Sequence, residues 1–305
     1  VKEVLDSGWL AHGPKNKEFE KLFTSEIGTK HATCFNSCAS ALYGAIVALG
    51  LKGEIILPSF TFSASANVIE LAGCTPVFAD IDPITMNLDS EDLSTRITDK
   101  TVAIMPVHYA GQVCDMEKIM ALARKHNLRV IEDSAETLGA SLNGKVAGSF
   151  DIGCFSFYPT KNITTGEGGM VTHDYDELIA NLNAAKAHGI TRPTFVREKE
   201  AKPYHRDAIV PGHNFRMSDI NAAIGVVQMS KLSEMNQLRR EHSQYLNEGL
   251  KDLVRVPVVE DINTHVYQMY VVQVEEIGDR DPLLEFLKAS GIGASVHFDP
   301  PVHMQ

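Results

Sequence analysis

The chain has 305 residues, of which 44% are hydrophobic and 22% charged, and its net charge at pH 7 is -11. This composition is that of a soluble globular protein that can bury a sizeable core. The negative charge argues against a nucleic-acid groove, because phosphate binding needs clustered Lys and Arg. Five cysteines without C-x-x-C spacing argue against a disulfide framework or a zinc site and fit a reducing cytosol. The sequence has neither an apolar run of membrane-spanning length nor a signal-peptide pattern.

Short apolar runs alternate with helical patterns through the first half of the chain. Helices are predicted at residues 39–49, 61–71 and 116–126, the last with Asp115 as its N-cap. Strands are predicted at residues 54–57, 76–79, 101–105, 128–131 and 153–157. This alternation predicts βαβ units and a mostly parallel sheet. In such sheets the ligand lies beyond the carboxyl ends of the strands, so the residues that follow each strand are the candidates for a site.

The second half has a different pattern. Residues 218–250 form a long helical stretch, followed by strand-like runs at 254–256, 267–274 and 294–298 and a helix at 282–289. We interpret residues 1–225 as a large domain and residues 226–305 as a small α+β domain. The chain lacks an initiator Met and ends shortly after an expected strand, so we expect trimmed ends and an incomplete small domain.

Three groups of polar residues follow predicted strands or open predicted helices. Residues 36–40 (Asn-Ser-Cys-Ala-Ser) open a helix, whose free N–H groups can hold a phosphate, although ordinary capping by Ser37 is the simpler interpretation. Asp133 follows the fourth strand and could hold a protonated ring nitrogen, a hydroxyl or a metal, or cap a turn. Lys161 follows the fifth strand and precedes a Gly-rich turn at residues 166–169. A lysine desolvated there would have a lowered pKa and could form a Schiff base.

A phosphate cradle, an acid and a lysine, in this order along one sheet, together meet the requirements of pyridoxal 5'-phosphate (PLP). The alternative cofactors fit less well, because the chain has neither a G-x-G-x-x-G nor a G-x-x-x-x-G-K-[ST] motif. The histidines show no metal-ligand spacing, so no metal site is predicted.

Seven motifs in chain order carry a family resemblance. They are SGWL with GP at residues 7–14, PSFTF at 58–62, PVHYAG at 106–111, EDSA at 132–135, SF with KN at 156–162, GEGG at 166–169 and HNFRMSD at 213–219. They resemble the motifs of the DegT/StrS family of sugar aminotransferases, which are PLP enzymes of fold type I, the aspartate aminotransferase-like fold. The resemblance covers nearly the whole chain. It implies an α/β fold with a large three-layer domain, a mostly parallel sheet and a small α+β C-terminal domain.

The resemblance also implies roles for the matched residues. Lys161 would form the Schiff base and later move the proton as an acid–base group, Asp133 would face the pyridine nitrogen, and Phe62 would stack on the ring. The phosphate would be held by Ser156 and by the backbone N–H groups near Ala39 and Ser40. Asn214 would reach the phosphate of the cofactor in a neighbouring subunit, which implies a homodimer with shared active sites.

At three positions, the comparison with the family pattern indicates what role a residue has. Cys38-Ala39 stands where the family commonly has Gly-Thr, so no phosphate bond is assigned to that side chain and Cys38 is interpreted as a packing residue. Glu136 stands where many members have Gln or His beside the phenolic oxygen of the cofactor. A carboxylate would repel a phenolate there, so we expect Glu136 to be protonated or out of contact. Family dehydratases replace the lysine with His, so the presence of Lys161 favours transamination.

The resemblance implies a ping-pong transfer of an amino group, with L-glutamate as the donor. The implied acceptor is a nucleotide-linked 3- or 4-keto deoxysugar that feeds polysaccharide or antibiotic sugar biosynthesis in the cytoplasm. A cyclitol or an aminobenzoate precursor is an alternative substrate, and a non-catalytic PLP-binding regulatory protein is an alternative function. Only small-molecule substrates are expected, with no nucleic acid or membrane partner. Residues 298–303 resemble the start of a substrate-proximal segment, and residues 192–204 are either a nucleotide contact or a solvated loop.

Overall fold

The computed structural model describes residues 1–190, 207–259, 261, 264–275 and 277–305. Its centre is a seven-stranded sheet with the strand order β1-β9-β8-β5-β4-β2-β3. All strand pairs are parallel except the two pairs that β9 makes with β1 and β8. The predicted mostly parallel sheet is therefore confirmed. The strands are β1 (His31–Phe35), β2 (Glu54–Pro58), β3 (Thr75–Ala79), β4 (Thr101–Ile104), β5 (Arg129–Asp133), β8 (Ile152–Ser156) and β9 (Gly169–His173).

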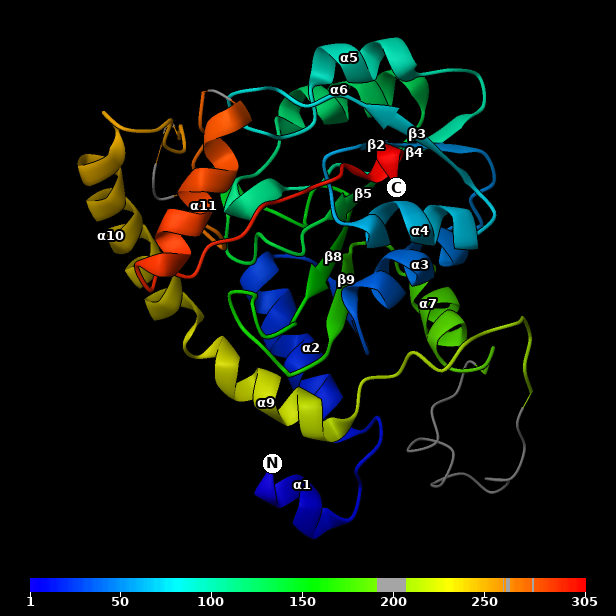
Figure 1. The fold of residues 1–305 in the computed structure, drawn as a ribbon. Helices are drawn as coiled ribbons and strands as arrows, with labels where there is room; N and C mark the ends of the chain where they lie inside the picture. Colours follow the sequence, from blue (N-terminus) through cyan, green and yellow to red (C-terminus); the bar gives the residue numbers. More distant parts are fainter. Residues whose placement is uncertain (191–206, 260, 262–263, 276) are drawn as a thin grey trace.

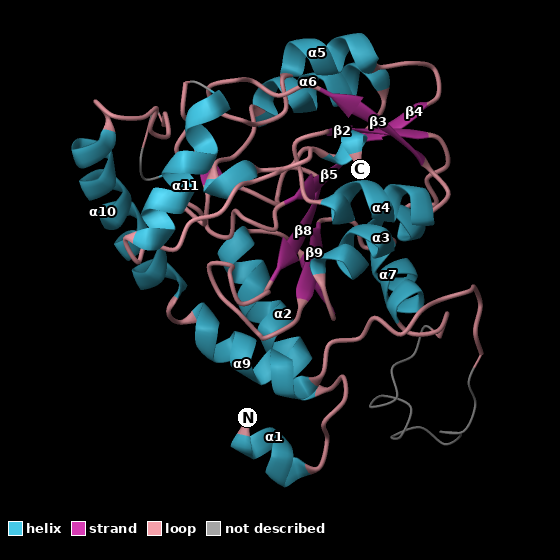
Figure 2. Ribbon diagram, viewed as in Figure 1, coloured by secondary structure: helices cyan, strands magenta, loops and turns pink. Residues whose placement is uncertain are grey.

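Helices cover both faces of this sheet, which gives three layers (Figures 1 and 2). One face packs against α3 (Cys38–Ala48), α4 (Ser63–Leu71) and α7 (Leu178–Lys186). The other face packs against α2 (Pro14–Ile27), α5 (Ser90–Arg96), α6 (Met116–His126) and α9 (Asp219–Met229). Side chains alternate along each strand, so that Ile131 joins the first layer and its neighbour Val130 the second. Both faces are buried, which explains the continuous apolar runs in the sequence.

Most predicted elements lie within two residues of the observed ones. The helix at residues 116–126 has the predicted bounds, and the Asp115 side chain accepts a hydrogen bond from the Lys118 N–H at 3.2 Å as its N-cap. Strands β1 and β9 were not predicted, because each is short and contains polar residues among the apolar ones. The hairpin of β6 (Ser141–Leu142) and β7 (Lys145–Val146) and the terminal helix α1 (Lys2–Ser7) were also not predicted.

The C-terminal part is mostly helix and loop. It contains α10 (Leu232–Leu250), α11 (Arg280–Ala289) and the short 3-10 helices η3 (Ile277–Asp279) and η4 (Val302–Met304). The runs predicted as strands contain, within the described residues, one isolated bridge between Arg255 and Gln273. The predicted domain boundary at residue 225 falls inside α9 and stays a prediction. None of the helices in the described ranges is long and apolar enough to cross a membrane.

Asp219 joins two motifs that are 200 residues apart in the chain. Its buried carboxylate accepts hydrogen bonds from the backbone N–H groups of Gly13, Lys15 and Asn16 at 2.9–3.1 Å and from the Asn16 amide at 2.7 Å. Its own N–H donates to the carbonyl oxygens of Leu10 and Ala11 at 3.1 and 3.0 Å. Asp219 of the RMSD motif thus holds the N-terminal segment that contains the GP motif against α9.

We expect Asp219→Ala to destabilise the protein by roughly 3 kcal/mol, because each buried donor left without an acceptor costs about 1–3 kcal/mol. Asp219→Asn keeps one acceptor oxygen and should lose less. Urea denaturation of both variants measures the difference. Equal stability of Asp219→Ala and the unmodified protein would show that water replaces the carboxylate.

Candidate active site

Lys161 and Glu136 form an ion pair at the carboxyl edge of the sheet. The Lys161 Nζ lies 3.1 Å from the Glu136 Oε1, and the two side chains are 16% and 12% exposed. The other carboxylate oxygen, Oε2, accepts a hydrogen bond from the Ala110 N–H at 2.9 Å. Both oxygens of Glu136 thus accept hydrogen bonds. The sequence did not predict this contact, and the expectation that Glu136 is protonated or out of contact with the cofactor stays a prediction.

Asp133 lies at the end of β5, on the face of the sheet that α4 covers. Its Oδ2 accepts a hydrogen bond from the Ser65 hydroxyl at 2.8 Å, and its Oδ1 accepts one from the Ala135 N–H at 3.2 Å. The Ser65 hydroxyl lies 3.0 Å from the Thr61 hydroxyl in turn. Burial raises the pKa of Asp133, although these two hydrogen bonds and the charge of Lys161 act in the opposite direction. Among the described residues no cation forms an ion pair with Asp133, and a protonated pyridine nitrogen would supply one.

The N-terminus of α3 lies beside the end of β8 and the start of β9. The Ser37 side chain caps the helix by accepting from the Ser40 N–H at 3.1 Å. This cap uses the Ser40 N–H, so among the two predicted amides only that of Ala39 has no acceptor within the cap or the helix. Ser156 ends β8 and pairs with Gly169 of β9. The predicted phosphate residues therefore surround one helix N-terminus.

Gly169 allows this close approach. A Cβ atom at this position would lie 2.3 Å from the Ser37 carbonyl oxygen and 2.7 Å from the Cys38 nitrogen. Gly169→Ala should therefore push the start of α3 away and weaken PLP binding by about tenfold or more, the order of effect of a misplaced binding group. Titration of the apo protein with PLP measures this. Gly249→Ala is the matched control, because a Cβ there meets nothing within 4 Å and should leave affinity unchanged.

Phe62 precedes α4 and is 65% exposed, so its ring is free to stack on a ligand beside Asp133. The C-terminal segment reaches the same region. Phe298 packs against Phe60 and Tyr109 with ring centroids 5.5 and 6.2 Å apart, and the Val302 N–H donates to the Ser59 carbonyl at 3.0 Å. The substrate-proximal position expected of residues 298–303 stays a prediction.

Asn214 is exposed, and its backbone pairs with Ala187. The next residue, Phe215, accepts a hydrogen bond from the Asn36 N–H at 2.8 Å, which places this segment beside the loop that opens α3. The role of Asn214 in a neighbouring subunit stays a prediction. The candidate nucleotide contact at residues 192–204 lies outside the described residues.

Two other side chains could be mistaken for reactive groups. Lys186 is buried, its Nζ donates to the Cys34 carbonyl at 3.2 Å, and burial lowers its pKa. The amine lies between α7, β1 and α2, 3.8 Å from the Glu20 carboxylate and 5.8 Å from the centre of the Phe35 ring. Burial raises the pKa of the Cys38 thiol well above its usual range, which agrees with a packing role.

The residues present fit PLP on structural grounds. The tight approach of Gly169 to α3 leaves a backbone cradle for the phosphate, buried Asp133 can hold a ring nitrogen, and Lys161 can reach an aldehyde between them. Two further contacts complete the site, from Ser65 to Asp133 and from Ala110 to Glu136. No pattern in a single sequence indicates either of them.

Comparisons with known proteins agree with this geometry. The DegT/DnrJ/EryC1/StrS aminotransferase family matches residues 1–305. The chain is 39% identical to the spore coat polysaccharide biosynthesis protein SpsC of Bacillus subtilis, over 100% of the chain and 80% of SpsC. It resembles the structure of DesI in the presence of its TDP-sugar product (TM-score 0.87, 33% identity, 99% of the chain and 76% of DesI). It also resembles a putative sugar aminotransferase, Spr1654 of Streptococcus pneumoniae, in its PMP form (TM-score 0.92, 28% identity, 100% and 83% covered).

The match along the whole chain and the placement of the lysine, the acid and the cradle lead to one assignment. The chain belongs to the DegT/DnrJ/EryC1/StrS aminotransferase family and is a PLP-dependent enzyme of the sugar aminotransferase type.

Proposed function

We propose that this enzyme transfers an amino group from L-glutamate to a nucleotide-linked 3- or 4-keto deoxysugar for polysaccharide or antibiotic sugar biosynthesis. The observation that carries the proposal is the Lys161 amine, held 3.1 Å from Glu136 at the strand ends beside Asp133. The similarity to SpsC and to DesI, whose structure was solved with its TDP-sugar product, supports a sugar acceptor. Five free cysteines fit a reducing compartment, and we infer a cytoplasmic location.

When bound, PLP supplies an electrophilic aldehyde and an electron-withdrawing ring. The side chains of this chain would then divide the remaining work. Lys161 would bind the aldehyde and move a proton at the carbon that carries the amino group. Asp133 would keep the proton on the ring nitrogen, and the N-terminus of α3 would hold the phosphate.

A donor and acceptor screen tests the reaction. The PLP-loaded protein should lose its visible absorbance on addition of L-glutamate and regain it on addition of a nucleotide keto sugar, whose product gains an amino group by mass spectrometry. If a keto cyclitol is the only acceptor that is converted, the substrate is a cyclitol and not a nucleotide sugar. A loaded protein that responds to no amino donor would favour the regulatory alternative.

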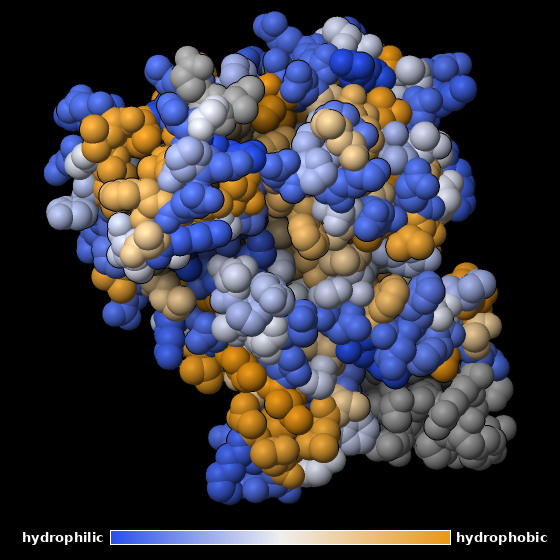
Figure 3. All heavy atoms as spheres, viewed as in Figure 1, coloured by the Kyte–Doolittle hydropathy of each residue, from blue (hydrophilic) through white to orange (hydrophobic). Residues whose placement is uncertain are grey.

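We also propose a homodimer in which Asn214 completes the site of the partner. Apolar side chains gather over α9 and α1 (Figure 3). Val227 of α9 and Leu5 of α1 are 56% and 53% exposed. Such a patch on an otherwise charged protein is typical of an interface.

Mixing two inactive variants tests this arrangement. In a mixed dimer of Lys161→Ala and Asn214→Ala chains, a shared site would combine the intact Lys161 of one chain with the intact Asn214 of the other. Each mixed dimer would then have one complete site of two, so an equal mixture, in which about half of the dimers are mixed, should regain about a quarter of the normal activity. If Asn214 serves its own chain, both sites of the mixed dimer carry one defect and no activity returns.

A further inference from the structure

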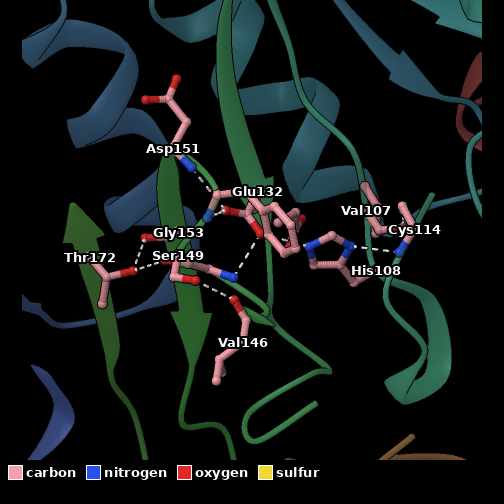
Figure 4. Close-up of polar contacts among 12 residues, drawn as sticks. Val107, His108, Cys114, Glu132, Val146, Ser149, Asp151, Gly153 and Thr172 are labelled. Carbon is pink, nitrogen blue, oxygen red and sulfur yellow. Dashed lines mark hydrogen bonds and ion pairs between the residues drawn. The ribbon is translucent and has the colours of Figure 1, made fainter. Parts of the chain in front are cut away.

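Behind Asp133, on the opposite face of the sheet, lies a buried acid–histidine pair. Glu132 and Asp133 are neighbours on β5, so their side chains point to opposite faces. The Glu132 Oε2 lies 3.0 Å from the His108 Nε2, and both side chains are fully buried. Figure 4 shows the pair between the loop that contains Cys114 and the start of β8. Neither residue has a role in the reaction described above.

The hydrogen bonds fix the direction of this contact. The Cys114 N–H donates to the His108 Nδ1 at 3.1 Å, so Nδ1 carries no proton and Nε2 donates to Glu132. The Glu132 carboxylate also accepts from the N–H groups of Gly148 and Phe150, both at 2.7 Å, and of Asp151 at 3.3 Å. Four donors therefore satisfy a buried charge, and the imidazole is held in one orientation.

The backbone around His108 leads from this pair to the active site. The His108 N–H donates to the Asp133 carbonyl at 3.1 Å, and the Asp133 N–H donates to the Pro106 carbonyl at 2.9 Å. The next residues form the 3-10 turn η1 (Tyr109–Gly111), in which Ala110 has a φ of 56°. The left-handed region is unfavourable for alanine, so the surrounding contacts must hold this turn. The Ala110 N–H donates a hydrogen bond to Glu136, and Glu136 accepts another from the Lys161 amine.

We propose that Glu132 and His108 are a positioning pair, which fixes the 109–111 turn and, through Ala110 and Glu136, the place of the Lys161 amine. The pair touches neither substrate nor cofactor. Its effect rests on the proposed role of Lys161, and peptide mapping of the cofactor-bound lysine tests that role separately.

Two substitutions at His108 separate the contact from the volume of the ring. His108→Asn keeps an acceptor near the Nδ1 position but cannot reach Glu132, whereas His108→Gln keeps a donor near the Nε2 position. In the PLP-loaded protein, His108→Asn should lower kcat of the half-reaction with the amino donor by about tenfold to a hundredfold. This is the range found when a residue that orients a metal-binding side chain through a hydrogen bond is replaced. It should also shift the pH midpoint of the visible absorbance. His108→Gln should keep most of both properties.

A double-mutant cycle with Glu136→Gln shows whether the effect passes through Glu136. If it does, His108→Asn adds little to the spectral shift that Glu136→Gln already causes. Additive shifts, or a folded His108→Asn protein with an unchanged midpoint and kcat, would overturn the proposal. If His108→Asn does not fold, Ala110→Gly replaces it in the cycle, because glycine frees the turn without altering the core. The same shift in midpoint is then expected, and its absence would equally overturn the proposal.

Discussion

Replacing Lys161 with alanine should abolish covalent cofactor binding and lower kcat by at least about 10³-fold. The lysine combines two functions, since it binds the aldehyde and moves the proton, and a general acid–base group alone contributes about 10²- to 10⁴-fold. Fold and stability should change little, because the amine is partly exposed and its contact is the Glu136 ion pair. Visible absorbance and the rate of the donor half-reaction measure the loss.

The control for this variant is Lys125→Ala, an exposed lysine in the last turn of α6. It should keep the absorbance and the rate of the unmodified enzyme. An active Lys161→Ala protein that stays yellow and binds the cofactor covalently would show that another amine has this role.

Asp133→Asn should lower kcat by about 10²- to 10³-fold and yet stabilise the apo protein at neutral pH. The loss of rate follows because an amide cannot stabilise the proton on the ring nitrogen, and removal of one preorganised charge-stabilising group costs about this factor. The gain in stability follows because the buried carboxylate is costly without a cationic partner. The amide keeps the shape and can still accept from Ser65.

The sign of the pH dependence can be derived from the same shift. Burial raises the pKa of Asp133 in the folded apo protein above the unfolded value of about 3.9. Between these two pKa values the folded state binds more protons than the unfolded state, so stability falls as the pH rises through this window. The stability of the Asp133→Asn variant should not decrease over this pH range. Urea denaturation at several pH values measures it, and PLP should stabilise the unmodified protein more than the variant. Parallel stability curves for both proteins would contradict the account.

The sequence predicted the parts of the site that lie at strand ends. Asp133 and Lys161 follow apolar strands of a parallel sheet, and this placement alone brings them to one edge. The contacts between side chains were not predictable in the same way. The Ser65–Asp133 hydrogen bond joins residues 68 positions apart, and the Ala110–Glu136 bond depends on a left-handed turn at an alanine. No local pattern encodes either one.

The same distinction applies to the fold. The helix at residues 116–126 combines a capping aspartate with a clear apolar stripe, and its bounds were predicted correctly. The runs near residues 254–274 are apolar and β-branched, as strands are, but the described residues form only a bridge there. Strand formation depends on a neighbouring strand, and the sequence of one run does not show whether that neighbour exists.

The position of the reactive lysine also illustrates what the sequence leaves open. Burial lowers the pKa of Lys186, which is a property expected of a nucleophilic lysine. Its amine is buried and donates to the Cys34 carbonyl, whereas Lys161 lies among groups that fit the cofactor. Access and surroundings, rather than the pKa, decide between them.

Borohydride reduction of the PLP-loaded protein, followed by trypsin digestion and mass spectrometry, tests the central claim most directly. Reduction fixes the cofactor on its lysine, and a modified Lys161 is not cleaved by trypsin. The expected result is one labelled peptide that spans residues 146–186, from the residue after Lys145 to Lys186, with the added mass on Lys161. Normal cleavage after Lys161, with the label on Lys186 or on any other lysine, would contradict it.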